Sequence, residues 1–241
     1  MTTPPPSTSG GQAQFPPGHP LAGLEDQVDR LRDCGRDFYG RGWSLGTSSN
    51  YSVVIGRRPL ELLVTASGKD KGQLLPDDFV RVDATGQPVV TGQPKSSAET
   101  LLHTVLAQNP EVGAVLHTHS VWSTVLSEQF AAAGGIEISG YEMLKGLAGV
   151  ATHEHSEWIA ILENSQDIPA LSSQLEAMLD EPGNRIAHGF LLRRHGLYTW
   201  GRDLAEARRH IEIIEFLLEC VARTQQLSAT AATSEMLSHR A

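Results

Sequence analysis

GAVLHTHS, residues 113–120, is an apolar run that ends in polar residues, which predicts a short buried strand before a helix. Side chains two residues apart in a strand point to the same side of the sheet, so His117 and His119 would lie together. Two imidazoles at a strand end make a suitable pair of metal ligands, and α/β sheets place their chemistry at strand ends. The alternative is structural: both residues simply end a strand, and Ser120 caps the following helix.

A second apolar run, GFLLRRHG at residues 189–196, also ends in a histidine and a glycine. With the residues that follow it, this run predicts two strands around a turn at Gly196. Catalytic zinc typically takes three protein ligands and leaves a position open for water or substrate. His117, His119 and His195 would satisfy that requirement, so the residues by themselves indicate a three-histidine metal site.

The remaining histidines fit structural positions better. His153 and His155 have the same spacing as the first pair, but no β-like apolar run precedes them, so we expect a solvated loop. His103 and His210 lie in helix-like stretches and His188 precedes a strand. We expect these three side chains to pack in the interior or lie on the surface.

Outward from these motifs, strand-like and helix-like segments alternate. Apolar residues at helical spacing predict a helix from Leu24 to about Arg41 and a last, long helix that begins at Asp203. Between them, helices are predicted in 95–110, ended by Asn109-Pro110, and in 121–134 and 168–179. Short β-like runs lie between them, namely YSVVIG, LELLVTA, FVRVD and IAIL. This order indicates an α/β or α+β sandwich with one sheet covered by helices.

Neither end of the chain shows the periodic apolar spacing of helices and strands. Residues 1–20 are rich in Pro, Gly, Ser, Thr and Gln and predict a disordered tail, with packing on a partner subunit as the alternative. Residues 21–228 predict a single catalytic domain. Residues 229–241 predict a flexible C-terminal tail.

Composition bounds the class of protein. The 241 residues, 40% hydrophobic and 20% charged, match a globular protein with a sizeable core. Only two cysteines occur, Cys34 and Cys220, so we expect no disulfide framework and a cytoplasmic location. No apolar run approaches the ~20 residues of a membrane span, and the N-terminus lacks the pattern of a signal peptide.

The formal net charge of −9 argues against a nucleic-acid partner, because such binding needs a basic face. An anionic small molecule remains compatible, since a few local donors hold one phosphate.

Six motifs occur in the order found in the class II aldolase superfamily, which the chain resembles over residues 21–227. They are GTSSNYSV, TASGKDKG, KSSAETLLH, VLHTHS, GYEMLKGL and LLRRHGLYTWG. The last motif together with GYEMLKGL resembles most the branch that dehydrates methylthioribulose phosphate. The resemblance implies a three-layer α/β/α sandwich with a central mixed, largely antiparallel sheet. It also implies a homotetramer with active sites near subunit interfaces, and a small phosphorylated sugar as substrate.

The same resemblance assigns roles to single residues. It places one zinc ion per subunit on the three histidines chosen above. It places the phosphate at Ser67, Gly68 and Ser97, and substrate oxygens at Asn50. Gly-rich turns with hydroxyl groups suit an anion, although Ser67-Gly68 also fits an ordinary turn. The chain departs from the aldolase pattern at Ala98, where the second serine would stand. A nearby lysine could compensate, the candidates being Lys69, Lys71, Lys95 and Lys145.

Two glutamates compete for the acid/base role. Glu99 occupies the position of the aldolases' catalytic acid, yet with Ser96 it also forms the pattern of a helix capping box. Glu142 matches the glutamate that acts as acid/base in the dehydratases, and its alternative is a surface carboxylate paired with Lys145. We favour Glu142, with Glu99 positioning the substrate or a metal-bound water.

The activity implied by the resemblance is dehydration of 5-methylthioribulose 1-phosphate to 2,3-diketo-5-methylthiopentyl 1-phosphate. The alternative reaction on the same scaffold is aldol cleavage of a ketose 1-phosphate to dihydroxyacetone phosphate and an aldehyde. A protein that keeps the fold for binding alone is disfavoured, because it would not need an open three-histidine site.

Overall fold

The computed structural model describes residues 11–238 and contains one sheet of eight strands in this range. The strand order is β3-β2-β1-β4-β8-β7-β6-β5, and neighbouring strands are antiparallel except the parallel pair β6–β7. The strands are β1 (Asn50–Arg57), β2 (Leu60–Thr65), β3 (Phe79–Asp83), β4 (Ala114–Thr118), β5 (Gly135–Ser139), β6 (Ser156–Leu162), β7 (Gly189–Leu192) and β8 (Gly196–Gly201). The predicted mixed, largely antiparallel sheet is therefore confirmed.

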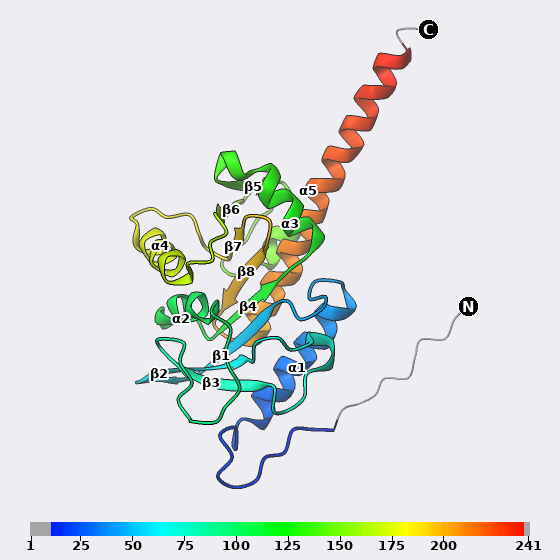
Figure 1. Ribbon diagram of the computed structural model, residues 1–241. Coiled ribbons are helices and arrows are strands. Elements are labelled where there is room, and N and C mark those ends of the chain that lie inside the picture. Colours follow the sequence, from blue (N-terminus) through cyan, green and yellow to red (C-terminus); the bar gives the residue numbers. More distant parts are fainter. Residues whose placement is uncertain (1–10, 239–241) are drawn as a thin grey trace, which may run out of the picture.

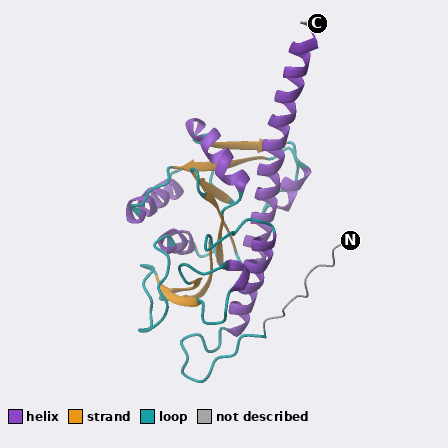
Figure 2. Ribbon diagram, turned by 45° about the vertical axis from the view of Figure 1, so that its right-hand side comes forward, coloured by secondary structure: helices purple, strands orange, loops and turns teal. Residues whose placement is uncertain are grey.

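Helices cover both faces of this sheet. The long ones are α1 (Glu25–Gly40), α2 (Thr100–Gln108), α3 (Val121–Gln129), α4 (Ile168–Asp180) and α5 (Leu204–Ser238). Three short 3-10 helices join them, namely η1 (Lys71–Gln73), η2 (Ala131–Ala133) and η3 (Glu142–Gly146). Figures 1 and 2 show α2 and α4 on one side of the sheet and α1, α3 and α5 on the other. The protein is thus the three-layer α/β/α sandwich that the sequence predicts.

The central strand β4 shows how the layers are built. Leu116 is buried in the core shared with α1 and α5, whereas Val115 is buried in the core shared with α2 and α4. His117 lies two positions after Val115 in the strand, so it points to the same face of the sheet as Val115. The sheet register places Asn50 of β1 and Tyr198 of β8 on either side of His117.

The N-terminal segment differs from the predicted tail in its described part. Residues 1–10 lie outside the described residues, but residues 11–20 lie against α1. Ala13 is buried, and its N–H donates to both carboxylate oxygens of Asp29 at 3.1 and 3.0 Å. Arg32, also buried, donates to the carbonyl of Gly11 at 3.1 Å. Hydrogen bonds between the backbone of this segment and the side chains of Asp29 and Arg32 in α1 thus hold a segment whose composition suggested disorder.

At the other end, α5 continues as a helix to Ser238, through most of the region predicted as a flexible tail. Figure 1 shows its last turns extending beyond the sheet. None of the helices in the described range is long and apolar enough to cross a membrane.

Arg32 gives a test of how the N-terminal segment is held. Its guanidinium also donates to Leu74 O at 2.9 Å and to Asp29 at 2.6 Å. Arg32→Met should lower the free energy of unfolding by about 2–3 kcal/mol, because it leaves buried acceptors unpaired. Urea unfolding measures this. The matched control is Arg36→Met, whose exposed pair with Asp33 should contribute less than about 1 kcal/mol. Equal stability of the two variants would contradict this account.

Candidate metal centre and its pocket

Three histidines meet at one end of the sheet. His117 lies in β4, His119 follows the end of that strand, and His195 lies in the turn between β7 and β8. Their candidate ligand atoms all lie within 4.8 Å of one another, and Nε2 of His117 is 2.8 Å from Nε2 of His119. Residues far apart in sequence therefore form the cluster that the spacing predicts.

The turn that carries His195 is tightly constrained. Arg194, immediately before it, has a positive φ of 55°. Gly196, immediately after it, allows the two strands to approach closely, because a Cβ there would lie 2.0 Å from Thr118 O. The glycine that follows the histidine is thus required by packing.

The protonation of the cluster fits a metal ion. Nδ1–H of His117 donates to the carbonyl of Leu197 at 3.0 Å, which leaves the lone pair of Nε2 facing the other two rings. Burial, and then the charges of nearby histidines, hold the pKa of His117 well below its ordinary value. Burial, followed by the charges of His195 and Lys71, lowers the pKa of His119 to about 3, and burial lowers the pKa of His195. All three rings are therefore neutral near pH 7, as metal ligands must be.

A buried polar atom that lacks a hydrogen-bond partner also indicates that the cluster holds a ligand or an ion. Within the described residues, Nδ1 of His195 is buried without a hydrogen-bond partner. Such an atom is costly to bury unless a ligand or ion satisfies it. A set of three imidazoles suits zinc, and also other transition metals. These three histidines could therefore hold a metal ion.

A pocket of about 310 Å³ opens beside the cluster. It brings together His119 and His195 with the predicted substrate-binding residues and one of the two glutamates, namely Asn50, Ser67, Gly68, Ser97 and Glu99. The pocket also includes Ala98, as expected from the departure in the aldolase pattern, and hydroxyl residues that sequence reasoning missed, namely Thr47, Ser48, Ser49 and Ser165. None of the four candidate lysines is among the described lining residues.

The position of Glu99 decides between its two predicted roles. Oε2 of Glu99 accepts a hydrogen bond from Nδ2 of Asn50 at 2.9 Å, and Oε1 lies 3.3 Å from Nε2 of His195. The Ser96 hydroxyl donates to Gly86 O instead, and no side-chain cap forms at the start of α2. The capping-box alternative is therefore wrong, and Glu99 belongs to the pocket.

His103 supports this arrangement from beneath. It is fully buried, with Nδ1 2.8 Å from the Ser52 hydroxyl and Nε2 hydrogen bonded to Oδ1 of Asn50. Because Oδ1 of Asn50 only accepts, Nε2 of His103 carries the proton and its Nδ1 accepts from Ser52. Each residue of the series Ser52, His103, Asn50 and Glu99 therefore donates a hydrogen bond to the next one. The sequence contains a signal for this: His103 follows Glu99 by four residues, which places both on one helix face.

Tyr198 is a second residue that the sequence did not single out. Its ring stacks on His117, with the ring centroids 3.9 Å apart and an angle of 13° between the planes. Tyr198 is fully buried, so this stacking fixes the orientation of the His117 ring.

The structure does not bring Glu142 into this pocket. Its carboxylate accepts a hydrogen bond from Lys145 at 2.6 Å, and 73% of its side chain is exposed. The Lys145 hydrogen bond holds the pKa of Glu142 below its ordinary value. The segment η3 that carries it packs against α5 through the buried Leu144, on the face of the sheet opposite the pocket.

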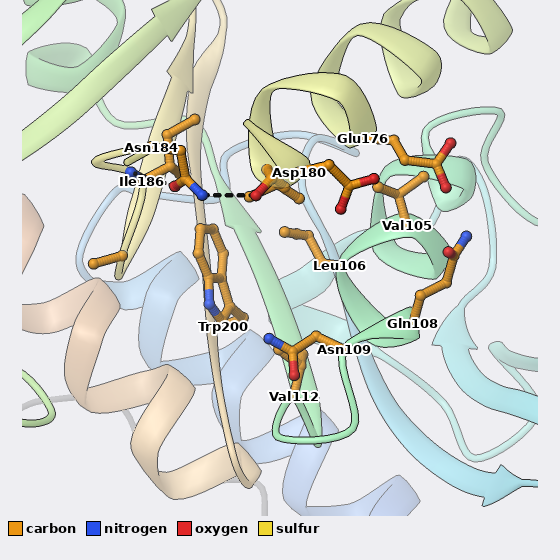
Figure 3. A pocket seen from close by; sticks show the side chains of 12 residues that line it. Val105, Leu106, Gln108, Asn109, Val112, Glu176, Asp180, Asn184, Ile186 and Trp200 are labelled. Carbon is orange, nitrogen blue, oxygen red and sulfur yellow. Dashed lines mark hydrogen bonds between the residues drawn. The ribbon is translucent and has the colours of Figure 1, made fainter. Parts of the chain in front are cut away.

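A separate cleft of about 500 Å³ lies between α2 and α4, near the other end of β4 and β8. Figure 3 shows Trp200, Glu176 and Asp180 among the side chains that line it. Because its described lining contains no histidine, we do not assign the chemistry to this cleft.

Comparisons with known proteins agree with this geometry. The Class II Aldolase and Adducin N-terminal domain family matches residues 29–222. A methylthioribulose-1-phosphate dehydratase of Pseudomonas fluorescens is 46% identical over 204 residues, which are 84% of this chain and 95% of that protein. Another from Marinobacter nauticus is 48% identical over 196 residues, which are 81% of this chain and 92% of that protein.

Solved structures show the same fold at low identity. L-fuculose-1-phosphate aldolase of Thermus thermophilus superposes with a TM-score of 0.66 at 20% identity, over 85% of this chain and 98% of that chain. YgbL, a putative aldolase/epimerase/decarboxylase of Escherichia coli, gives 0.67 at 24% identity, over 81% of this chain and 88% of that chain.

The neutral buried histidines predict an acid-sensitive stability. Burial lowers the pKa of His103 to about 3 and of His210 to about 4, besides the three cluster histidines. Below their ordinary pKa of 6.5 the unfolded chain binds protons that the native state does not. As the pH is lowered below 6.5, the free energy of unfolding of the metal-free protein should therefore fall by up to about 1.4 kcal/mol per pH unit for each of these histidines.

Urea unfolding between about pH 7 and pH 5 measures this slope. His103→Phe should reduce the slope by about one proton, because it removes one such ring. A stability that does not change over this range would show that the rings are not held neutral.

Proposed function

Because the chain belongs to the class II aldolase and adducin N-terminal domain family and to its methylthioribulose-1-phosphate dehydratase branch, we propose the activity of that branch. The protein is a metal-dependent hydro-lyase in methionine salvage. It converts 5-methylthioribulose 1-phosphate into 2,3-diketo-5-methylthiopentyl 1-phosphate and water. The observation that carries this proposal is the 46–48% identity over nearly the whole length of named dehydratases, with the three histidines assembled in one pocket.

In this proposal one zinc ion per subunit is held by His117, His119 and His195. A bound zinc ion supplies Lewis acidity, which stabilises negative charge on substrate oxygens and so acidifies a neighbouring C–H bond. The stacked Tyr198 and the Leu197 carbonyl keep the His117 ring in the orientation that ligation requires.

The phosphate is held by Ser67, Gly68 and Ser97. Gly68 has a positive φ of 71°, so the backbone N–H groups of this turn can face an anion together with the serine hydroxyls. Asn50 contacts the substrate oxygens, and its amide is oriented by His103 and Glu99. Glu99 thereby positions the substrate or a water at the centre.

A base removes the C3 proton, and Glu142 in its protonated form donates a proton to the C4 hydroxyl as the C4–O bond breaks and water leaves. The resulting enol tautomerises to the 2,3-diketone. Since η3 packs on the opposite face within one chain, the proposal requires that Glu142 act in the site of a neighbouring subunit of a homotetramer. The exposure of Glu142 and of Met143, which is 41% exposed, supports contact with another chain. Burial at that contact would raise the pKa of Glu142, as an acid working near neutral pH requires.

Aldol cleavage of a ketose 1-phosphate is the second candidate. The observation that favours it is Glu99, the residue at the position of the aldolases' catalytic acid, which lies beside the histidines. The named dehydratase relatives weigh more, because structural likeness at about 20% identity shows only the fold. A cytoplasmic location is part of the proposal and is supported by the two free cysteines.

The first experiment is proton NMR of 5-methylthioribulose 1-phosphate incubated with the zinc-loaded protein and with a chelator-treated control. The diketone phosphate should appear only in the metal-loaded sample. His117→Ala should lose both zinc and turnover. Glu142→Gln should retain zinc and lose about 10²- to 10⁴-fold in kcat, because it removes the general acid. Formation of dihydroxyacetone phosphate and an aldehyde would instead establish the aldolase.

Mixed oligomers test whether Glu142 acts across subunits. Tetramers that contain both His117→Ala and Glu142→Gln subunits should regain up to roughly a quarter of the wild-type activity. In these tetramers some sites combine an intact His117 from one subunit with an intact Glu142 from its neighbour. Each variant alone is the control. Mixed oligomers as inactive as both parents would place Glu142 in its own subunit's site or outside catalysis.

A further inference from the structure

A second cluster of histidines, outside the metal site, holds the segment that connects β5 and β6. This segment, residues 140–155, carries η3 and Glu142. Leu144 and Leu147 anchor it in the core, and Arg209 of α5 donates to Gly146 O at 2.8 Å.

Two histidines from different parts of the chain bind the same peptide of this segment. Nε2 of His210, in α5, accepts the N–H of Ala148 at 3.2 Å. Nε2 of His188, just before β7, donates to the carbonyl of Ala148 at 2.8 Å. The two rings lie edge to face with their centroids 5.0 Å apart. Ala148 is thus held at both its donor and its acceptor.

The partners of these rings settle where the protons lie. Nδ1 of His210 faces the carbonyl of Trp200 at 2.7 Å and must donate, so His210 is neutral with Nε2 free to accept. Nδ1 of His188 faces Oε1 of Glu157 at 2.9 Å, while its Nε2 faces a carbonyl. With an ionised Glu157, both nitrogens of His188 carry protons, and the ring is an imidazolium.

Glu157 is built to hold that charge. It is buried, and its second oxygen lies 2.7 Å from Nε2 of His155. Burial alone would lower the pKa of His188, but the hydrogen bond and charge of Glu157 outweigh it and raise this pKa above 6.5. Burial likewise opposes ionisation of Glu157, but the two histidines keep its pKa below the ordinary value.

We propose that His188, held by Glu157, and His210 form a clamp on Ala148 that sets the position of Glu142 and opens when His188 loses its charge. This inference rests on the proposed function only in the role given to Glu142, since the clamp itself is a set of contacts. His188 and His210 are positioning residues that touch the segment and not the substrate.

The direction of the pH dependence follows from the groups that face His188. These are Glu157 and His155 from β6 and the residues before it, with His210, Glu206 and Arg209 from α5. Because the pKa of His188 is raised in the folded protein, the clamp is complete below pH 6.5 and is lost as the pH rises through that raised pKa. Above it, the remaining proton stays on Nδ1 against the Glu157 carboxylate, so a lone pair of Nε2 would face the carbonyl of Ala148 and that hydrogen bond would be lost.

Amide hydrogen exchange at Ala148 in the zinc-loaded protein, followed from about pH 6 to pH 9, tests the clamp. After correction for intrinsic rates, wild-type protection should fall as the pH rises. His188→Ala should remove at least about tenfold of the protection at pH 6 and lower kcat by a similar factor, with KM and zinc content little changed. His188→Gln should restore protection without pH dependence, because its amide can donate to Ala148 O but does not titrate.

The matched control is His19→Gln, which makes the same exchange of side chains on the N-terminal segment. It should leave both exchange and kcat unchanged. Unaltered exchange at Ala148 in His188→Ala, or pH-independent protection in the wild type, would overturn the clamp. If His188→Ala frees the segment while Glu142→Gln turns over normally, the clamp stands and the role of Glu142 in the proposed function fails.

Discussion

The position of β4 at the middle of the sheet, paired with β1 on one side and β8 on the other, is the constraint on which the site depends. Its register sets His117 between Asn50 and Tyr198. A slip of one residue would turn His117 to the α1 and α5 face. Leu116 and Val115 prevent this slip, because each is buried in a different apolar layer. The orientation of a metal ligand is thus determined by hydrophobic packing.

Several of the buried polar groups around β4 have a defined partner. His117 donates to the carbonyl of Leu197, and His103 lies between Ser52 and Asn50. Burying neutral imidazoles is tolerable when their nitrogens are satisfied, and the lone pairs that remain face one another at the cluster. The same polar chain that satisfies Asn50 also orients Glu99.

Histidine serves two opposite purposes in this fold. At the metal centre burial keeps the rings neutral, whereas at the β5–β6 connection the buried carboxylate of Glu157 keeps His188 protonated. The charge of one glutamate makes the difference, because Glu157 contacts His188 directly. At the histidine cluster, Glu99 lies 3.3 Å from Nε2 of His195 and raises the pKa of that ring, but burial outweighs it.

The sequence by itself determined the α/β/α class, the His117–His119 pair, His195 as the third histidine of the cluster, and the family, because strand period and motif order are local properties of the chain. Only the tertiary structure decided that Glu99 enters the pocket and does not cap α2, that His103 and Tyr198 support the site, and that Glu142 lies on the opposite face. It also decided that residues 11–20 lie against α1. These outcomes depend on contacts between residues far apart in the chain, and a local pattern such as Ser-x-x-Glu fits either environment.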